Sequence, residues 1–172
     1  MSPKLEAVLA RLIKQLGPIY KTQAVKMPYI VDVLAQRVLG QPITGGTHRA
    51  WDHGVVTQEV YHGLGESPYF RLRQIEGREN QQRVCLVQTP ECDLSEAERE
   101  IVDFVAREYG RMKPRDLGIF TKRMNPDIPP KGWGQNALAR TDHEAYIHMG
   151  EPWQRFAEKL EALKPSDLAD QS

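Results

Sequence analysis

Apolar residues recur at three- and four-residue spacing in several parts of the chain, a pattern typical of helices that bury one face. The first such stretch runs from Pro3 to Leu16, with Ser2 as a candidate N-cap and Gly17-Pro18 as a stop signal. A second, from about Pro28 to Leu39, is apolar on nearly every side, so we expect a buried central helix there. A short third helix is expected over Val55–Leu64.

The pattern changes in the second half of the chain. Two short β-like segments, Tyr69–Ile75 and Arg83–Gln88, predict a hairpin with a longer loop. Ser95 and Glu98 form a capping-box pattern, which predicts a helix that ends at Gly110. Further helices are expected to begin at Pro114, near Asp142 and at Pro152. Residues 41–53 and 125–136 are loop-like in composition.

Together these elements predict a mainly α protein, a compact helical domain of six or seven helices with one small β-hairpin. The chain has 172 residues, and this length fits one domain, which we assign to residues 1–163. The polar residues 164–172 are expected to form a frayed C-terminal tail.

Charge and cysteine content narrow the class of protein. The 23 Lys and Arg residues balance 23 Asp and Glu residues, which argues against bulk electrostatic binding of nucleic acid but leaves room for a local basic patch. Cys85 and Cys92 lack CxxC spacing and are too few for a disulfide framework. No apolar run is long enough for a signal peptide or a membrane span, so we expect a cytoplasmic protein without a membrane partner.

The residue types that carry catalysis or bind metal do not form a known motif. The five histidines include His48, His53 and His62, and none falls in an HExxH pattern, so we expect histidines in loops or at the surface, with no metal and no cofactor. A GxSxG elbow and a phosphate-binding Gly-rich loop are also missing from the sequence. Cys85 is expected to be inert packing in a strand. We therefore do not expect an enzyme.

Charged residues are unevenly distributed. Acidic residues dominate 91–103 and basic residues dominate 107–123. This distribution complements a helix dipole, and it also fits a basic face that meets an acidic partner or nucleic acid. Arg71, Arg73, Arg78 and Arg83 on the hairpin would contact phosphates if the fold were a winged helix, although no recognition helix rich in Arg, Asn and Gln accompanies them.

Two tryptophans fall in loop-like contexts, Trp51 in HRAWDHG and Trp133 in PPKGWGQN. A loop tryptophan either fixes the loop to the core or serves as an anchor in an interface, where Trp and Tyr are enriched. The sequence leaves both interpretations open.

Four segments carry a resemblance to a known family: KMPYIVDVLAQRVLGQPI (26–43), AWDHGVV (50–56), EVYHGL (59–64) and LSEAEREIVDFVAREYGRMKPRDLGIFTK (94–122). In order and spacing they resemble the Panacea domain, also called the SocA-like or phage-associated antitoxin domain, over residues 26–133. The matching positions are Lys26, Tyr29, Gly40, Pro42, Trp51, Gly54, Val55, Tyr61, Leu94, Tyr109, Gly110, Leu117, Thr121 and Trp133. Val55 replaces a proline and Lys122 a histidine that the family often has.

The resemblance implies an antitoxin that binds and blocks a protein toxin, usually encoded by a neighbouring gene on mobile or prophage DNA, and it implies no enzymatic activity. The residues expected near the toxin-binding surface are Trp51, His53, Tyr61, Lys122 and Trp133. The alternative is a DNA-binding transcriptional regulator of a mobile-element or prophage operon. The sequence determines neither the toxin nor the oligomeric state.

Overall fold

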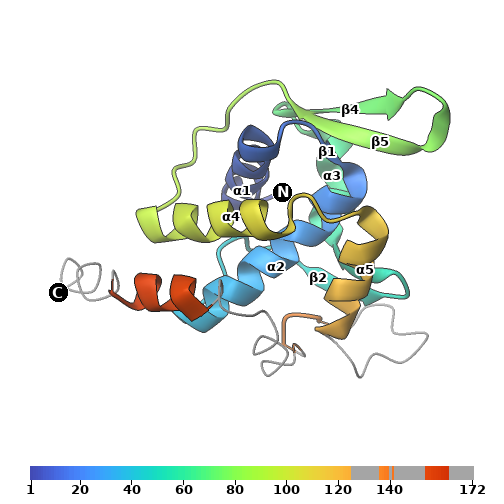
Figure 1. The fold of residues 1–172 in the computed structure, drawn as a ribbon. Coiled ribbons are helices and arrows are strands. Elements are labelled where there is room, and N and C mark those ends of the chain that lie inside the picture. Colours follow the sequence, from blue (N-terminus) through green and yellow to red (C-terminus); the bar gives the residue numbers. More distant parts are fainter. Residues whose placement is uncertain (125–135, 140, 142–153, 163–172) are drawn as a thin grey trace.

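Helix α2, Lys21–Leu39, crosses the middle of the molecule, and other elements pack around it (Figure 1). The computed structural model describes residues 1–124, 136–139, 141 and 154–162, without the side chains of residues 79 and 80. The helix is buried along most of its length, as its apolar sequence predicts. Its expected start at Pro28 is wrong, because Pro28 lies inside the helix. The first turn is polar, and the side chain of Gln23 accepts a hydrogen bond from the Tyr20 backbone N–H at 2.8 Å.

Helices α1, Pro3–Leu16, and α4, Glu96–Tyr109, pack against each other and against α2. The predicted N-terminal caps are confirmed: Ser2 accepts a hydrogen bond from Leu5, and Ser95 and Glu98 form the capping box. Arg11 on α1 forms two hydrogen bonds with Asp103 on α4, at 2.7 and 2.8 Å.

The expectation of one small hairpin is wrong, because the described residues contain two sheets. The hairpin itself is confirmed as β4, Phe70–Ile75, and β5, Arg78–Leu86. Its expected longer loop is wrong, because only residues 76 and 77 separate the two strands and β5 begins before the expected Arg83. Strand β1, Ile19–Tyr20, extends it to an antiparallel sheet of order β1-β5-β4, with Ile19 opposite Val84. Two residues are too few to produce an alternating sequence pattern, so β1 is recognisable as a strand only from its pairing with β5.

The second sheet pairs β2, His48–Trp51, with β3, Gly54–Thr57. It lies where the sequence predicted a loop and then a helix from Val55 to Leu64. The helical part of that segment is α3, Gln58–Gly63, followed by a 3-10 turn at Leu64–Glu66. Val55 and Val56 favour a strand because both are β-branched, and both are buried.

Helix α5, Pro114–Arg123, packs on β3 and α2 beside the β2–β3 turn (Figure 1). Residues 154–162 form a further helix, whose Phe156 ring stacks on Phe104 of α4 with ring centroids 4.2 Å apart. The helix expected near residues 142–149 and the tail at 164–172 lie outside the described residues. Among the helices described, none combines the length and the apolar character that a bilayer span requires.

Candidate functional site

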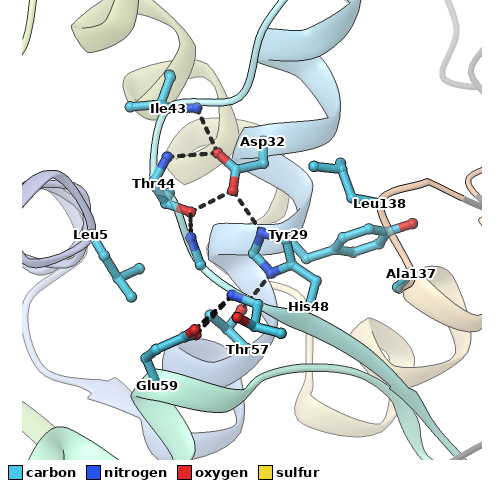
Figure 2. Close-up of polar contacts among 12 residues, drawn as sticks. Leu5, Tyr29, Asp32, Ile43, Thr44, His48, Thr57, Glu59, Ala137 and Leu138 are labelled. Atoms are coloured by element: carbon cyan, nitrogen blue, oxygen red, sulfur yellow. Dashed lines mark hydrogen bonds and ion pairs between the residues drawn. The ribbon is translucent and has the colours of Figure 1, made fainter. Parts of the chain in front are cut away.

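A network of buried polar side chains surrounds Asp32 of α2 (Figure 2). One carboxylate oxygen of Asp32 accepts hydrogen bonds from the backbone N–H groups of Ile43 and Thr44, each at 2.8 Å. The other oxygen contacts the Thr44 hydroxyl and, at 2.6 Å, the Nε2 atom of His48. Nδ1 of His48 lies 2.9 Å from the Thr57 hydroxyl. The network ties the loop after α2 and both strands of the β2–β3 sheet to the central helix.

Carboxylate, imidazole and hydroxyl follow one another in this network as they do in hydrolytic triads. Solvent access distinguishes this network from a hydrolytic triad, because Asp32 is 0% exposed and His48 is 2% exposed. A substrate cannot reach the Thr57 hydroxyl, which is also fully buried. The network therefore acts as a structural element that satisfies buried polar groups. His48 was expected in a loop or at the surface; that expectation is wrong, because His48 begins strand β2 and is buried.

A second set of contacts joins α2, the β2–β3 sheet and α5. The Lys26 ammonium donates a hydrogen bond to the Val55 carbonyl at 3.2 Å, and the Val55 N–H donates to the Thr121 hydroxyl at 3.1 Å. Lys26 is only 4% exposed, and this burial lowers its pKa to about 8. Burial has this effect because the charged amine loses hydration that one carbonyl does not replace.

The β2–β3 turn and α5 approach each other at two glycines. A Cβ atom on Gly54 would lie 2.5 Å from the Thr121 hydroxyl and 2.7 Å from the Gly118 carbonyl, and Gly54 also has a positive φ of 109°. A Cβ atom on Gly118 would lie 2.6 Å from the His53 carbonyl. This close approach places residues 52–54 directly beside Lys26.

The turn, α2 and α5 border an open pocket of about 540 Å³, which we call the Lys26 pocket. Lys122 lines it and donates a hydrogen bond to the Asp52 carbonyl at 3.2 Å. Ile119 also lines it and is 44% exposed. The described lining residues are Thr22, Lys26, Asp52, His53, Pro114, Arg115, Gly118, Ile119 and Lys122. The described lining thus carries three basic side chains and one carboxylate.

Four of the five predicted partner-binding residues lie on or beside this pocket. His53 and Lys122 line it. Tyr61, 41% exposed, lines an adjacent pocket that shares Thr22 and Pro114 with the first. The Trp51 ring contacts the Tyr61 ring edge-on, with centroids 5.0 Å apart. Trp133 lies outside the described residues, and the role of all five in binding stays a prediction.

Sequence reasoning placed Trp51 in a loop, whereas it ends strand β2 and is partly buried. It missed Asp32 and Ile119, and it treated Lys26 only as a matching position. One signal for Asp32 was available, since it is the single acidic residue of a helix that is apolar on most sides. A carboxylate in such a helix needs polar partners elsewhere in the chain.

A wider basic groove lies next to the Lys26 pocket. Its volume is about 880 Å³, and it runs between β5 and the segment that leads into α5. Five basic residues line it: Arg78, Arg83, Arg111, Lys113 and Arg115. No acidic side chain is found among the described residues of its lining. The basic segment of the sequence thus faces the hairpin arginines.

In the described part of the chain, no group of three or more His, Cys, Asp or Glu residues could hold a metal ion.

The family model for the antitoxin SocA-like, Panacea domain matches residues 25–126. This chain belongs to that family. The resemblance based on the four sequence segments is thereby confirmed, although the match ends before Trp133. The Panacea domain contains Lys26, Gly54, Val55 and Thr121, which come from separate segments of the sequence and meet where α2, the β2–β3 sheet and α5 join. No curated protein and no solved structure matches the chain.

Proposed function

We propose that this protein is an antitoxin that binds a protein toxin directly, through the face that carries the Lys26 pocket and Tyr61. One observation supports this surface above others. Three large hydrophobic side chains are exposed among the described residues, Tyr61, Val87 and Ile119, and two of them flank the same pair of adjoining pockets. Membership of an antitoxin family supports the role itself.

The composition of this face is typical of protein–protein interfaces. Aromatic residues and arginine are enriched in interface cores, and a few of them provide most of the binding free energy. Tyr61 offers an aromatic ring above which the Lys21 ammonium lies at 5.3 Å, and Trp51 supports the ring from the side. A stable complex requires about 800 Å² from each partner. The two pockets and the exposed Ile119 supply the centre of such a contact.

In this mechanism the protein acts by covering its partner, and no bond is made or broken. A toxin bound by this face loses access to its own target as long as the complex persists. Neutralisation therefore depends on the stability of the complex and on the supply of antitoxin.

Co-expression with the products of the neighbouring genes tests this function. We expect one of those products to arrest growth when expressed alone, and we expect this protein to restore growth and to co-purify with it. Restored growth without a complex would contradict direct binding. A complete lack of toxic neighbours would contradict the antitoxin role.

The basic groove favours a second candidate function, binding of DNA as a regulator. Five basic residues from β5, from the segment before α5 and from its first turn line one groove, as phosphate contacts require. The test is a mobility shift with duplex DNA from upstream of the gene, at increasing salt. Binding that falls steeply with salt and is lost in Arg111→Gln/Lys113→Gln would support it. No shift at low salt would exclude it.

A further inference from the structure

We propose that the Lys26 pocket is an anion-binding subsite that receives the carboxylate of an acidic side chain of the partner protein. The inference rests on the proposed function, because it names the chemistry by which that face recognises its toxin. Charge, burial and geometry of the pocket support it independently of the family.

The ammonium of Lys26 has spare hydrogen-bonding capacity. It carries three N–H donors, and among the described residues it donates one hydrogen bond, to the Val55 carbonyl. Lys26 is 96% buried yet lines the pocket, so a group that enters the pocket lies beside this side chain. A buried cation with one neutral acceptor is poorly compensated, and an anion is the group that compensates it best.

The rim of the pocket adds positive charge at the entrance. Arg115 and Lys122 are exposed and line the same pocket. The hydrogen bond to the Asp52 carbonyl holds the Lys122 ammonium beside the turn at 3.2 Å. Asp52 contributes the one carboxylate of the described lining, so the cations outnumber it. An approaching carboxylate is attracted before it reaches Lys26.

Apolar groups line the remaining wall. Pro114 and Ile119 lie on the α5 side, and the backbone of Gly118 passes close to the turn. Such a wall reduces the contact of a bound carboxylate with water on one side, which strengthens an ion pair formed against it. The volume of about 540 Å³ accommodates an Asp or Glu side chain together with neighbouring atoms of its chain.

A single carboxylate fits this pocket better than a nucleic-acid backbone does. Phosphates of a duplex are spaced along the helix and call for a row of exposed cations. The Lys26 pocket instead ends at one buried amine and has Asp52 on its rim. The neighbouring basic groove has the row of cations that the Lys26 pocket lacks.

The titration of Lys26 supports the proposal and provides a specific measurement. Burial lowers the pKa of Lys26 to about 8 in the free protein. A carboxylate bound beside the amine favours its charged form and raises that pKa. If Lys26 served the fold alone, partner binding would leave the pKa unchanged or lower it through further burial.

The test measures affinity for the toxin that co-purifies with this protein, by calorimetry on purified components. Lys26→Met keeps the aliphatic stem and removes the amine, and Lys122→Gln removes the charge at the rim. We expect each to weaken binding at least tenfold. Lys14→Gln is the matched control, because Lys14 is an exposed lysine on α1 outside the pocket, and it should change affinity less than twofold. If Lys26→Met does not fold, the affinity of Lys122→Gln for the toxin tests the proposal.

NMR titration of the Lys26 side chain, in the free protein and in the complex, completes the test. We expect a higher pKa in the complex, and we expect one toxin Asp or Glu whose change to the amide is non-additive with Lys26→Met. Unchanged affinity in both variants, or an unchanged Lys26 titration, would overturn the subsite while leaving the antitoxin role intact. Failure of the wild-type protein to bind any toxic neighbour would instead overturn the proposed function.

Discussion

The ammonium of Lys26 and the backbone carbonyl of Val55 lie 3.2 Å apart, which joins the central helix to strand β3 in the interior of the protein. Val55 is in turn held by Thr121 of α5 through its N–H group. One buried lysine thus sits where three segments of the Panacea domain meet. The same arrangement that positions this amine at the pocket also reduces the stability of the fold.

Lys26→Met should stabilise the protein at neutral pH. The pKa of Lys26 falls from 10.5 to about 8 on folding, so the unfolded chain holds the proton more tightly. A shift of this size corresponds to a penalty of about 3 kcal/mol below pH 8. The variant also loses the hydrogen bond to Val55, which reduces the expected gain in stability by about 1 kcal/mol. We expect a net gain of about 2 kcal/mol at pH 7 in urea unfolding.

The gain from Lys26→Met should shrink as the pH rises from about 8 toward 10.5, because in this range only the unfolded wild-type chain holds the Lys26 proton, and a rising pH makes that protonation less favourable. Comparison of the two proteins at the same pH removes the effects of other groups that titrate. A stability difference that stays constant between pH 7 and pH 10 would show that the Lys26 charge is not destabilising.

Asp32→Ala should be strongly destabilising. The carboxylate accepts hydrogen bonds from two backbone N–H groups and contacts Thr44 and His48, all of them buried. Removing it leaves these groups without their acceptor, which costs about 3–5 kcal/mol for a buried pair. Urea unfolding or a thermal melt measures the loss.

Asp103→Ala is the control for the loss of a carboxylate at the surface. Asp103 pairs with Arg11, but both side chains are partly exposed, at 26% and 32%. We expect a loss of at most about 1 kcal/mol. Equal effects of Asp32→Ala and Asp103→Ala would show that the buried network contributes no more than a surface ion pair.

Gly54→Ala should separate the β2–β3 turn from α5. The new Cβ atom would lie 2.5 Å from the Thr121 hydroxyl, and the φ of 109° is unfavourable for any residue with a side chain. Overpacking alone costs about 1–3 kcal/mol, and the backbone strain adds to it. We expect a lower melting temperature and weaker toxin binding, because the turn lines the Lys26 pocket.

Gly65→Ala serves as the matched control for Gly54→Ala. No heavy atom lies within 4 Å of a Cβ placed there, and its φ is not positive. Its stability should match the wild type to within about 0.5 kcal/mol. A comparable loss in both variants would point to a general sensitivity to glycine replacement.

Tyr61→Ala should weaken toxin binding by about 2 kcal/mol or more, the range of interface hot spots, with little change in stability. The ring is 41% exposed and rests on Trp51. Val87→Ala is its control, since Val87 is 50% exposed but lies after strand β5 and outside both pockets. Calorimetry of each variant with the toxin measures the difference. Equal affinities for the two variants would place the interface elsewhere.

The features read correctly from the sequence depend on residues close together in the chain. Ser2 at the start of α1 and the Ser95–Glu98 box involve neighbours within three positions. The hairpin of β4 and β5 follows from the alternation of apolar residues and arginines in the first strand and from the apolar run at the end of the second. The family resemblance also followed from local segments, and the match over residues 25–126 confirms it.

The features that the sequence did not predict depend on contacts between residues far apart in the chain. Strand β1 exists because Ile19 pairs with Val84, and β2 pairs with β3 in a segment whose spacing of valines also fits a helix. His48 is buried because Asp32 and Thr57 satisfy both of its ring nitrogens. The Lys26 pocket is formed by α2, the turn at residues 52–54 and α5 together. Side-chain spacing along a chain encodes local periodicity, whereas burial and pairing depend on which distant segments the folded chain brings into contact.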